Sequence, residues 1–383
     1  MARPLLYAEI DLQAIDHNLR QLRKLLNPET LFLAAVKGNA YGHGAVEISQ
    51  RLVKKGVNQL GVARIEEAIQ LRQNGIQVPL LIFGYIGPDN VEELYHHNLT
   101  ATISSYENGL ALSKKAKLIG KSIKAHIKTD TGMGRLGINT NERCVDHKSQ
   151  NYQEIKEIKS IIELENIKIE GIYTHFASAD SADNTYAKRQ FALFSNLLKN
   201  LDKEKLNIPL RHAANSAAII SLPESHLNMV RSGIAIYGLK PSGKMNLQDV
   251  DLIPAMSIKA KIIHLKKVPV GFNVSYGSTH VTSDPTTIAT IPIGYADGFS
   301  RSLSSKGSML VGGRRAPIIG RVCMDLTMLD VGHLPDVKLG DEVVILGKQG
   351  NEEIAADEIS NLLDTINYEI VSSITARVPR LMV

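Results

Sequence analysis

A lysine followed by a glycine-rich loop marks the stretch of this sequence best suited to covalent chemistry. Lys37 stands directly after residues 31–36, LFLAAV, an apolar run typical of a parallel strand covered on both faces. Active sites of α/β sheets and barrels form at the carboxyl ends of strands, so Lys37 is well placed. A lysine desolvated there lowers its pKa readily and can form a Schiff base with a carbonyl. The alternative is a solvated lysine in a tight loop, because short motifs often match by chance.

The loop after Lys37 is predicted to lead into a helix. Glycines at positions 38, 42 and 44 let the backbone turn sharply or approach a ligand closely. Ala45, Ile48 and Leu52 then recur at helical spacing. A helix N-terminus, which favours anions, is therefore expected after the loop.

Residues 132–137, GMGRLG, match the glycine pattern of dinucleotide-binding loops. That fingerprint also requires a helix directly after it and an acidic residue about 20 residues further on. Here residues 139–141, Asn-Thr-Asn, delay any helix, and several strands already precede the motif. A nicotinamide-dependent oxidoreductase is therefore a remote alternative, and a glycine loop with a surface ion pair is another.

Three further polar residues are candidates for ligand binding. His175 ends a predicted strand at 167–174, where it could stack on a planar cofactor, although a lone histidine is usually structural. Ser216 precedes a short helix, so its hydroxyl and the helix N–H groups could hold a phosphate; plain N-capping is the alternative. Arg231 would ordinarily be explained by a buried ion pair.

Several blocks of the sequence, in the expected order, resemble those of alanine racemases. The resemblance runs from Tyr7 to Arg380, and the blocks together are far more specific than any one alone. They are VKGNAYGHG at 36–44, KTDTGMGRLG at 128–137, YTHFA at 173–177, ANS at 214–216, MVRSGIAIYG at 229–238, SYGST at 275–279, GYADG at 294–298 and RVCMD at 321–325. The resemblance implies interconversion of L- and D-alanine with pyridoxal 5'-phosphate as cofactor.

The resemblance also assigns roles residue by residue. Lys37 would hold the cofactor and act as one catalytic base, with Tyr276 as the second. Arg135 and the Met324 backbone N–H would bind substrate, and Lys128 would match a lysine that is often carbamylated and positions Arg135. The other cofactor contacts would be Tyr41, His175, Asn215, Ser216, Arg231, Gly233 and Ile234, and the entrance to the site would be lined by Tyr295, Asp180, Arg301 and Arg321. No metal is expected.

These roles are chemically consistent. Racemisation by two bases needs acid–base groups on opposite faces of a planar intermediate, which Lys37 and Tyr276 would supply. A phenol with a pKa near 10 is a poor base, and Arg135 nearby would stabilise the phenolate. Arg231 would face the pyridine nitrogen, and a guanidinium can donate to that nitrogen but cannot protonate it. The cofactor would then be a weaker electron sink, which should suppress transamination.

The order of predicted elements favours a (β/α)₈ barrel followed by a β-rich domain. A strand at 5–12 and a helix containing Ile15, Leu19 and Leu22 open an alternation of strands and helices that allows about eight units before Tyr237. We expect a cofactor-binding barrel at 1–240 and a β-rich domain at 241–383, divided at the linker KPSGK, 240–244. Later predictions are strands at 257–263, 287–293, 309–311, 317–322 and 342–346, a hairpin turn at 312–313 and a helix spanning 359–366.

Composition sets limits on partners and location. Among 383 residues, 44 are basic and 39 acidic, giving a net charge of +5, and no basic run suggests a nucleic-acid tail. Only Cys144 and Cys323 occur, so no disulfide framework is implied and a reducing compartment fits. The opening residues lack a secretory h-region, and no stretch approaches the roughly 18 apolar residues of a membrane span. We expect a cytoplasmic enzyme without nucleic-acid or membrane partners.

The resemblance further implies a head-to-tail homodimer and a supply of D-alanine for peptidoglycan. One departure stands out, because Ala376 replaces a tyrosine that in the family usually touches the phosphate and narrows the pocket. Strict alanine specificity is therefore in doubt, and relaxed activity towards serine or a broader-specificity racemase is an alternative.

Two proteins of related fold would share part of this pattern. A decarboxylase of basic amino acids would have the barrel, the β domain and the cofactor lysine, but the blocks at 275–279 and 321–325 argue against it. A noncatalytic cofactor-binding protein of the same barrel class would normally lack the second domain. An amino-acid racemase is therefore the favoured interpretation.

Overall fold

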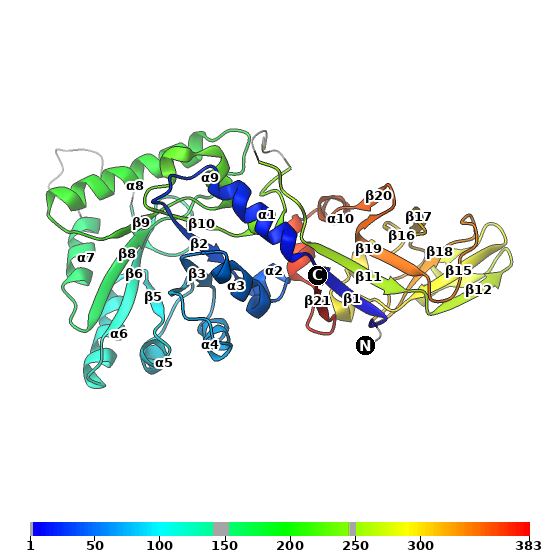
Figure 1. Ribbon diagram of the computed structural model, residues 1–383, viewed down its shortest axis with the longest axis horizontal. Helices are drawn as coiled ribbons and strands as arrows, with labels where there is room; N and C mark the ends of the chain where they lie inside the picture. The colour runs from blue at the N-terminus through cyan, green and yellow to red at the C-terminus, as the bar shows by residue number, and fades with distance from the viewer. Residues whose placement is uncertain (1–2, 141–152, 244, 246–249) are drawn as a thin grey trace. The chain divides into compact units, whose positions relative to one another are not determined.

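The computed structural model describes residues 3–140, 153–243, 245 and 250–383, which form two compact units (Figure 1). We call them the barrel unit and the strand-rich unit. The barrel unit comprises Asp16–Ala40 and Ala45–Leu252, and the strand-rich unit comprises Met1–Ile15, Tyr41–Gly44 and Ile253–Val383. Cys144 and Asn141 lie outside the described residues.

The barrel unit contains a closed barrel of eight parallel strands, as expected. The strands follow the order β5-β4-β3-β2-β10-β9-β8-β6, and pairing of β5 with β6 closes the ring. The short β7 (Ile138–Asn139) pairs with β6 beside the ring. The barrel strands are β2 (Leu31–Ala35), β3 (Gln59–Val62), β4 (Leu80–Ile82), β5 (Thr100–Ile103), β6 (Ile123–Asp130), β8 (Ile167–Tyr173), β9 (Leu210–His212) and β10 (Met229–Ser232).

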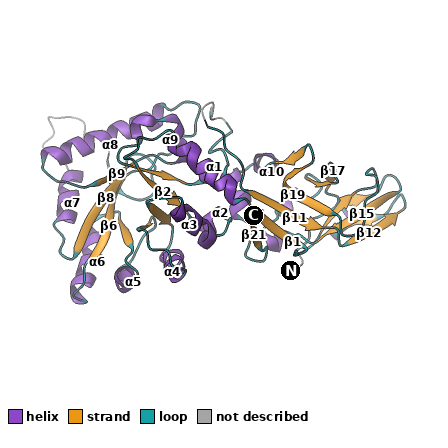
Figure 2. Cartoon of the chain, in the orientation of Figure 1, coloured by secondary structure: helices purple, strands orange, loops and turns teal. Residues whose placement is uncertain are grey.

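Helices alternate with these strands and cover the outside of the ring (Figure 2). In α3, for example, Ala45, Ile48 and Leu52 are buried, at the spacing that predicted this helix. The helices are α1 (Leu12–Arg23), α3 (Ala45–Lys54), α4 (Ile65–Gln73), α5 (Val91–His96), α6 (Tyr106–Leu118), α7 (Gln153–Ile162), α8 (Thr185–Lys203) and α9 (Ser216–Ser221). Shorter turns are the left-handed α2 (Lys37–Tyr41) and the 3₁₀ turns η1 (Pro88–Asn90), η3 (Pro223–Ser225) and η4 (Ile234–Tyr237).

The strand-rich unit is built around a mainly antiparallel sheet. Its strand order is β17-β16-β19-β11-β1-β21, with β20 beside β19; β12, β15 and β18 form a second sheet. The strands are β1 (Leu6–Ile10), β11 (Met256–Lys261), β12 (His264–Val268), β13 (Asn273–Val274), β14 (His280–Val281), β15 (Thr286–Ile291), β16 (Ser308–Val311), β17 (Arg314–Pro317), β18 (Thr327–Asp330), β19 (Glu342–Gln349), β20 (Glu352–Ile354) and β21 (Arg380–Met382). Its helical elements are α10 (Ala356–Leu363), α11 (Asn367–Ser372), η5 (Tyr276–Ser278), η6 (Tyr295–Asp297) and η7 (Arg301–Leu303).

Some local predictions differ from the structure. The first strand, expected in the barrel, instead pairs with β11 and β21, because its register is decided by partners far along the chain. The barrel uses β10 in its place, a segment that the sequence marks only as a motif. Residues 318–322 form no named strand beyond β17, and the helix predicted at 359–366 ends at Leu363, because Asp364 adopts a left-handed conformation (φ 53°). The hairpin at 312–313 is confirmed by the pairing of Val311 with Arg314.

The described residues contain no helix that is both long enough and apolar enough to cross a bilayer.

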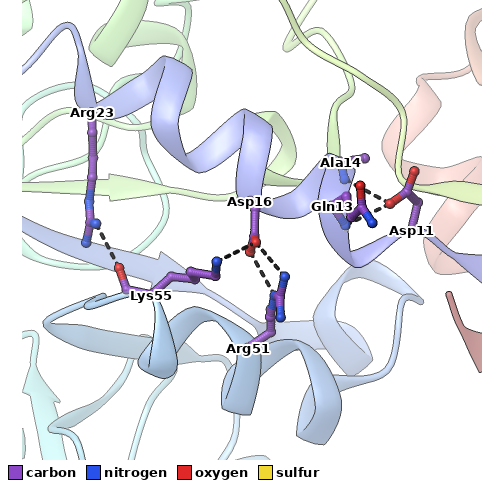
Figure 3. Close-up of polar contacts among 7 residues, drawn as sticks. All are labelled: Asp11, Gln13, Ala14, Asp16, Arg23, Arg51 and Lys55. Carbon is purple, nitrogen blue, oxygen red and sulfur yellow. Dashed lines mark hydrogen bonds and ion pairs between the residues drawn. The ribbon is translucent and has the colours of Figure 1, made fainter.

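The buried carboxylate of Asp16 joins α1 to α3 in the barrel unit (Figure 3). Asp16 of α1 accepts hydrogen bonds from Arg51 Nε at 2.9 Å and Nη2 at 2.5 Å, and lies 2.7 Å from Lys55 Nζ. Arg23, further along α1, donates to the carbonyls of Lys55 and Gly56 at 2.8 and 2.6 Å. Burial opposes ionisation of Asp16, but the bonds from Arg51 and Lys55 outweigh it and hold its pKa below the ordinary value of 3.8.

Asp16→Asn is expected to lower the free energy of unfolding at pH 7 by about 2–3 kcal/mol, less than for a fully buried pair because Arg51 and Lys55 reach solvent. The folded-state pKa lies below the unfolded value, so this stabilisation is present above pH 3.8 and is lost as the pH falls through the folded pKa. Denaturant unfolding of the unmodified protein and of Asp16→Asn, at pH 7 and at pH 3.5, measures the difference in their free energies of unfolding. The matched control is Asp202→Asn, whose exposed pair with Arg211 should contribute under about 1 kcal/mol; equal losses in the two variants would contradict the assignment.

Candidate active site

Lys37 begins a left-handed turn at the carboxyl end of β2. Gly38, Asn39, Ala40 and Tyr41 all have positive φ, at 61°, 55°, 54° and 52°. The left-handed conformation costs a residue with a side chain roughly 1–2 kcal/mol, so three such residues in succession require support from outside the turn. The loop for which the sequence indicates glycine flexibility is therefore a strained element that carries Lys37 at one end and Tyr41 at the other.

The surroundings of Lys37 lower the pKa of its amine below the ordinary value of 10.5. Burial lowers the pKa of Lys37, the charge of Arg135 lowers it further, and Glu67 opposes both. A neutral amine is the form that attacks a carbonyl group. Lys37 therefore has the electrostatic setting expected of a Schiff-base lysine.

Glu67 on α4 supports the start of the turn and was not foreseen from the sequence. Its Oε1 accepts from the Gly38 N–H at 2.6 Å, and its Oε2 accepts from the N–H groups of Ala63 and Arg64 at 2.7 and 3.0 Å. Its place in the first turn of a helix after β3 is the only sequence signal, and that signal is common to helix caps.

Asp130 shapes the glycine loop that follows β6. Its Oδ1 accepts from the N–H groups of Gly132, Met133 and Gly134, at 2.8–3.1 Å, and its Oδ2 accepts from the Arg135 N–H at 3.0 Å. Burial alone would raise the pKa of Asp130, but these four donors hold it below its ordinary value. The loop leads into β7, so the helix that a dinucleotide site requires does not follow before residue 140.

Arg231 on β10 is buried and bonded to neutral acceptors. Its Nη1 donates to His212 Nδ1 at 2.9 Å, and its Nη2 donates to the carbonyls of Thr174 and Ala213 at 2.7 and 3.0 Å and lies 3.2 Å from His175 Nδ1. No carboxylate of the described residues lies within ion-pair distance, so the expected alternative of a buried ion pair is wrong. Burial lowers its pKa to about 10, so the guanidinium remains charged at neutral pH.

A chain of neutral imidazoles begins at Arg231. Because a guanidinium only donates, His212 Nδ1 must accept, and its proton must lie on Nε2. His212 Nε2 is 2.9 Å from His126 Nδ1, so we assign the His126 proton to Nε2 as well. Burial and the charge of Arg231 lower the pKa of His126 to about 3 and that of His212 well below 6.5. Arg231 therefore determines the tautomer of two buried histidines.

Tyr173 at the end of β8 provides the aromatic floor of this cluster. Its ring stacks on His212 with centroids 4.7 Å apart, and its hydroxyl is 2.9 Å from Thr102 Oγ1. The Arg231 guanidinium and the Lys128 amine lie 5.1 and 5.7 Å from the ring centroid, within cation–π range. The sequence motifs did not indicate a role for Tyr173, His212 or His126. Tyr173 and His212 are nevertheless the last residues of barrel strands, and functional residues gather at such positions.

Lys128 on β6 is 3% exposed and surrounded mainly by positive charge. Burial lowers its pKa to about 8, and the charges of Arg135, Arg231 and Lys37 contribute in the same direction. Asp130 opposes them, but its carboxylate is already bonded to four backbone donors. About half of the Lys128 amines are thus neutral near pH 8.

Ser216 joins two segments at the carboxyl ends of β9 and β10. Its hydroxyl accepts from the Gly233 N–H at 2.8 Å and lies 3.2 Å from Ser232 Oγ. Asn215 is the residue that caps α9, through a bond from the Ala218 N–H at 2.9 Å. Gly233 and Ile234, also predicted, are buried beside this serine at the start of η4.

The remaining predicted residues gather mainly in the strand-rich unit. Tyr276 is 72% exposed, Met324 53% and Tyr295 43%. Ser275, beside Tyr276, donates to the Arg321 carbonyl at 2.7 Å, and the Tyr295 N–H donates to the Cys323 carbonyl at 3.1 Å. The segments that carry Tyr276, Tyr295 and Met324 are therefore bonded to one another and present their side chains outwards.

Three predicted entrance residues are less constrained. Arg301 is exposed at the start of η7, and Arg321 and Asp180 are half-buried. Arg321 belongs to the same bonded group as Tyr276, whereas Asp180 lies in the barrel unit after Ala179, whose carbonyl accepts from Ser221 Oγ.

Comparison with known protein families gives a match to each of the two parts of the chain. Residues 10–241 match the family model for the alanine racemase N-terminal domain, and residues 255–382 match the model for the C-terminal domain. The chain belongs to the alanine racemase family. It is 49% identical to the alanine racemase of Desulfosudis oleivorans over 374 residues, covering 98% of this chain and 95% of the relative. It is 46% identical to that of Methanococcus maripaludis over 376 residues, covering 98% of each.

The fold agrees with solved structures of alanine racemases. The alanine racemase of Clostridium difficile superposes with a TM-score of 0.93 at 38% identity, covering 100% of this chain and 97% of that one. The chain is therefore an isomerase of the alanine racemase family, with an α/β barrel and a β-rich C-terminal part. The predicted residues form two clusters, one at the carboxyl ends of the barrel strands and one on the strand-rich unit.

Proposed function

We propose that this enzyme interconverts L- and D-alanine with pyridoxal 5'-phosphate held on Lys37. The observation that carries the proposal is the position of Lys37 just after barrel strand β2, at its carboxyl end, where burial and the charge of Arg135 lower the pKa of the lysine. Membership of the alanine racemase family supports both the substrate and the cofactor.

The residues present fit this cofactor. Lys37 provides the amine, and Arg231 provides a charged donor that no carboxylate of the described residues neutralises. The Ser216 hydroxyl, the Ile234 N–H and the Tyr41 phenol would donate to a phosphate. The Gly233 N–H, which here donates to Ser216, and the amide of Asn215, whose oxygen caps α9, would join them. Pyridoxal phosphate, when bound, supplies the electron sink that makes the substrate Cα–H acidic.

The acid–base work is assigned to two side chains. Lys37 Nζ would take or return the Cα proton on one face and the Tyr276 phenol would do so on the other, with Arg135 stabilising the phenolate. The Met324 backbone N–H would bind the substrate carboxylate. In the described part of the chain that N–H makes no hydrogen bond, which supports the role.

Arg231 would limit the electron sink. Its guanidinium can donate to a ring nitrogen but cannot deliver a proton to it, and three of its five N–H groups already donate to His212, Thr174 and Ala213. Such an arrangement favours return of the proton to Cα over transamination.

We also propose a head-to-tail homodimer in which Tyr276 and Met324 enter the partner's site. The side chains of Tyr276, Met324 and Tyr295 are highly exposed, which supports the proposal that a second copy of the chain covers this surface. The functional division is proposed near residue 240, with a cofactor-binding barrel before it and a β-rich domain after it. Cytoplasmic synthesis of D-alanine for peptidoglycan is the proposed use. A decarboxylase with the same fold would instead release carbon dioxide, which a manometric assay distinguishes.

Complementation tests the reaction, both bases and the shared site together. Lys37→Ala chains should be inactive, and Tyr276→Phe chains should keep the cofactor yet lose about 10²–10⁴-fold in racemisation. When the two chains are mixed and reassociated, each hybrid dimer should contain one intact site, and activity should return in a chiral assay for D-alanine.

The controls separate the claims. Borohydride reduction and peptide mapping of the unmodified chain must place the cofactor on Lys37, and a label on another lysine would end that assignment. Near-normal turnover by Tyr276→Phe would refute the second base. Proven subunit exchange without recovered activity would refute the shared site.

Carbamylation of Lys128 is proposed on electrostatic grounds. A carbamate forms when the neutral amine, which a pKa of about 8 makes available, adds carbon dioxide and releases a proton. It would replace one positive charge by a negative one beside Arg135 and Arg231. Incubation with ¹³C-bicarbonate should give one protein carbamate signal in the NMR spectrum. Lys128→Arg, which keeps the charge but cannot be carbamylated, should lack it; a signal that persists would assign the carbamate elsewhere.

Ala376 is proposed to widen the substrate pocket. A methyl group in place of a phenol removes steric overlap with a larger side chain, and it also removes one possible bond to the phosphate. Discrimination by such a wall amounts to about 1–3 kcal/mol per added group, so serine should be the first additional substrate.

We predict measurable serine racemisation by this enzyme, with alanine still preferred. Ala376→Tyr should raise the ratio of kcat/KM for alanine over serine by roughly 10-fold or more, because it restores the wall. Steady-state kinetics with both substrates measure the ratio. Ala376→Ser is the small-residue control, and an unchanged ratio in Ala376→Tyr would show that another side chain, such as Tyr368, closes the pocket.

A further inference from the structure

The left-handed turn after Lys37 ends in a loop that is held by distant parts of the chain. Gly42 directly follows Tyr41 and has a φ of 85°. A Cβ at Gly42 would lie 2.0 Å from the Val371 carbonyl oxygen, so the loop is pressed against α11 with no room for a side chain. The end of the turn is thus placed by close backbone contact as well as by its own conformation.

Arg380 is hydrogen-bonded to the same loop at Gly42. Its Nε donates to the Gly42 carbonyl at 2.9 Å, although the two residues are 338 positions apart in the chain. Its Nη1 donates to the carbonyls of Thr375 and Val378 at 2.5 and 2.7 Å, and its Nη2 donates to that of Ile374 at 2.6 Å. The guanidinium, with five N–H donors in a fixed fork, thereby joins Gly42 to residues 374–378 through four carbonyls.

Only an arginine can make this set of bonds. The guanidinium is a rigid fork whose donors reach several acceptors at once, whereas a lysine ammonium is a single point charge. Arg380 also makes no ion pair among the described residues, and burial lowers its pKa. Its charge is therefore committed to backbone carbonyls and serves to fix their positions.

The bond from Arg380 to Gly42 lies next to Tyr41, a proposed cofactor contact. The Tyr41 ring packs against Tyr368 of α11, with centroids 6.1 Å apart and planes inclined by 54°. Burial raises the pKa of Tyr41 to about 12, so its phenol stays protonated and can donate to a phosphate. Since Tyr41 immediately precedes Gly42, the direction of the phenol depends on where Gly42 is held.

We propose that Arg380 is a positioning residue for the cofactor site: it holds Gly42 so that the strained turn from Lys37 to Tyr41 keeps its left-handed form and presents the Tyr41 phenol. The inference rests on the proposed use of pyridoxal phosphate by Lys37 and Tyr41. It assigns Arg380 no contact with cofactor or substrate.

Arg72 supplies a matched control. It too donates to four backbone carbonyls, those of Ile76, Val78, His97 and Asn98, at 2.7–3.1 Å. These carbonyls precede β4 and β5, at the end of the barrel opposite to the carboxyl ends that carry the proposed site. Loss of Arg72 therefore removes an equivalent set of bonds without touching the turn.

The experiment compares Arg380→Gln with Arg72→Gln in the full-length protein. Both variants should lower the Tm of the cofactor-free protein. Only Arg380→Gln should weaken binding of pyridoxal phosphate in an absorbance titration, by roughly 10–100-fold, as expected for loss of a charge-assisted bond that orders a ligand contact. In the saturated protein, kcat should fall for Arg380→Gln and stay near normal for Arg72→Gln.

Arg380→Lys provides a second variant if Arg380→Gln does not fold. It should recover part of the Tm but not the cofactor affinity, because one ammonium cannot reach Gly42 and residues 374–378 together. Affinity that falls equally in Arg72→Gln, or that Arg380→Lys fully restores, would overturn the proposal. Failure of the unmodified protein to bind pyridoxal phosphate at Lys37 would instead refute the proposed function.

Discussion

The carboxyl ends of three barrel strands are arranged around one buried guanidinium, which requires hydrogen-bond acceptors. Arg231 is 5% exposed and meets no carboxylate in the described part of the chain. Its charge is stabilised by carbonyls of Thr174 and Ala213, by His212 and by the face of Tyr173. Each of these acceptors ends a barrel strand or begins the loop after one, so a single side chain aligns three neighbouring strand ends.

That choice of neutral acceptors has electrostatic consequences. A carboxylate partner would have cancelled the charge, whereas carbonyls and imidazoles leave a positive field among Lys37, Lys128 and Arg135. Burial and the charge of Arg135 lower the pKa of Lys37, and burial with the charges of Arg135 and Arg231 lowers that of Lys128. Burial and the charge of Arg231 lower the pKa values of His175 and His212 well below 6.5. The same group of basic side chains therefore makes the amines of Lys37 and Lys128 easier to deprotonate, while Arg231 keeps its positive charge.

The support of the reactive segments is mostly backbone chemistry. Glu67 bonds to the N–H at the start of the Lys37 turn, Asp130 bonds to four N–H groups in the Arg135 loop, and Arg380 bonds to four carbonyls around Gly42. In each case one charged side chain is hydrogen-bonded to the backbone of a loop that contains residues with positive φ. Loops that carry function can in this way be as well defined as the strands that precede them.

Local patterns in the amino-acid chain were enough to predict alternating strands and helices followed by a β-rich part, because strand and helix periods are local. They also indicated the family, because Lys37, Arg135 and Tyr276 lie in distinctive blocks, but periodicity alone could not distinguish a barrel from an open sheet. They could not reveal that β1 pairs with β11 and β21 instead of joining the barrel, since strand register depends on partners far along the chain. Nor could they identify Glu67, His212 or Arg380, whose roles arise from bonds that carry no sequence signal. Those bonds exist only once the chain has folded, so which charged residues hold the site together became visible only in three dimensions.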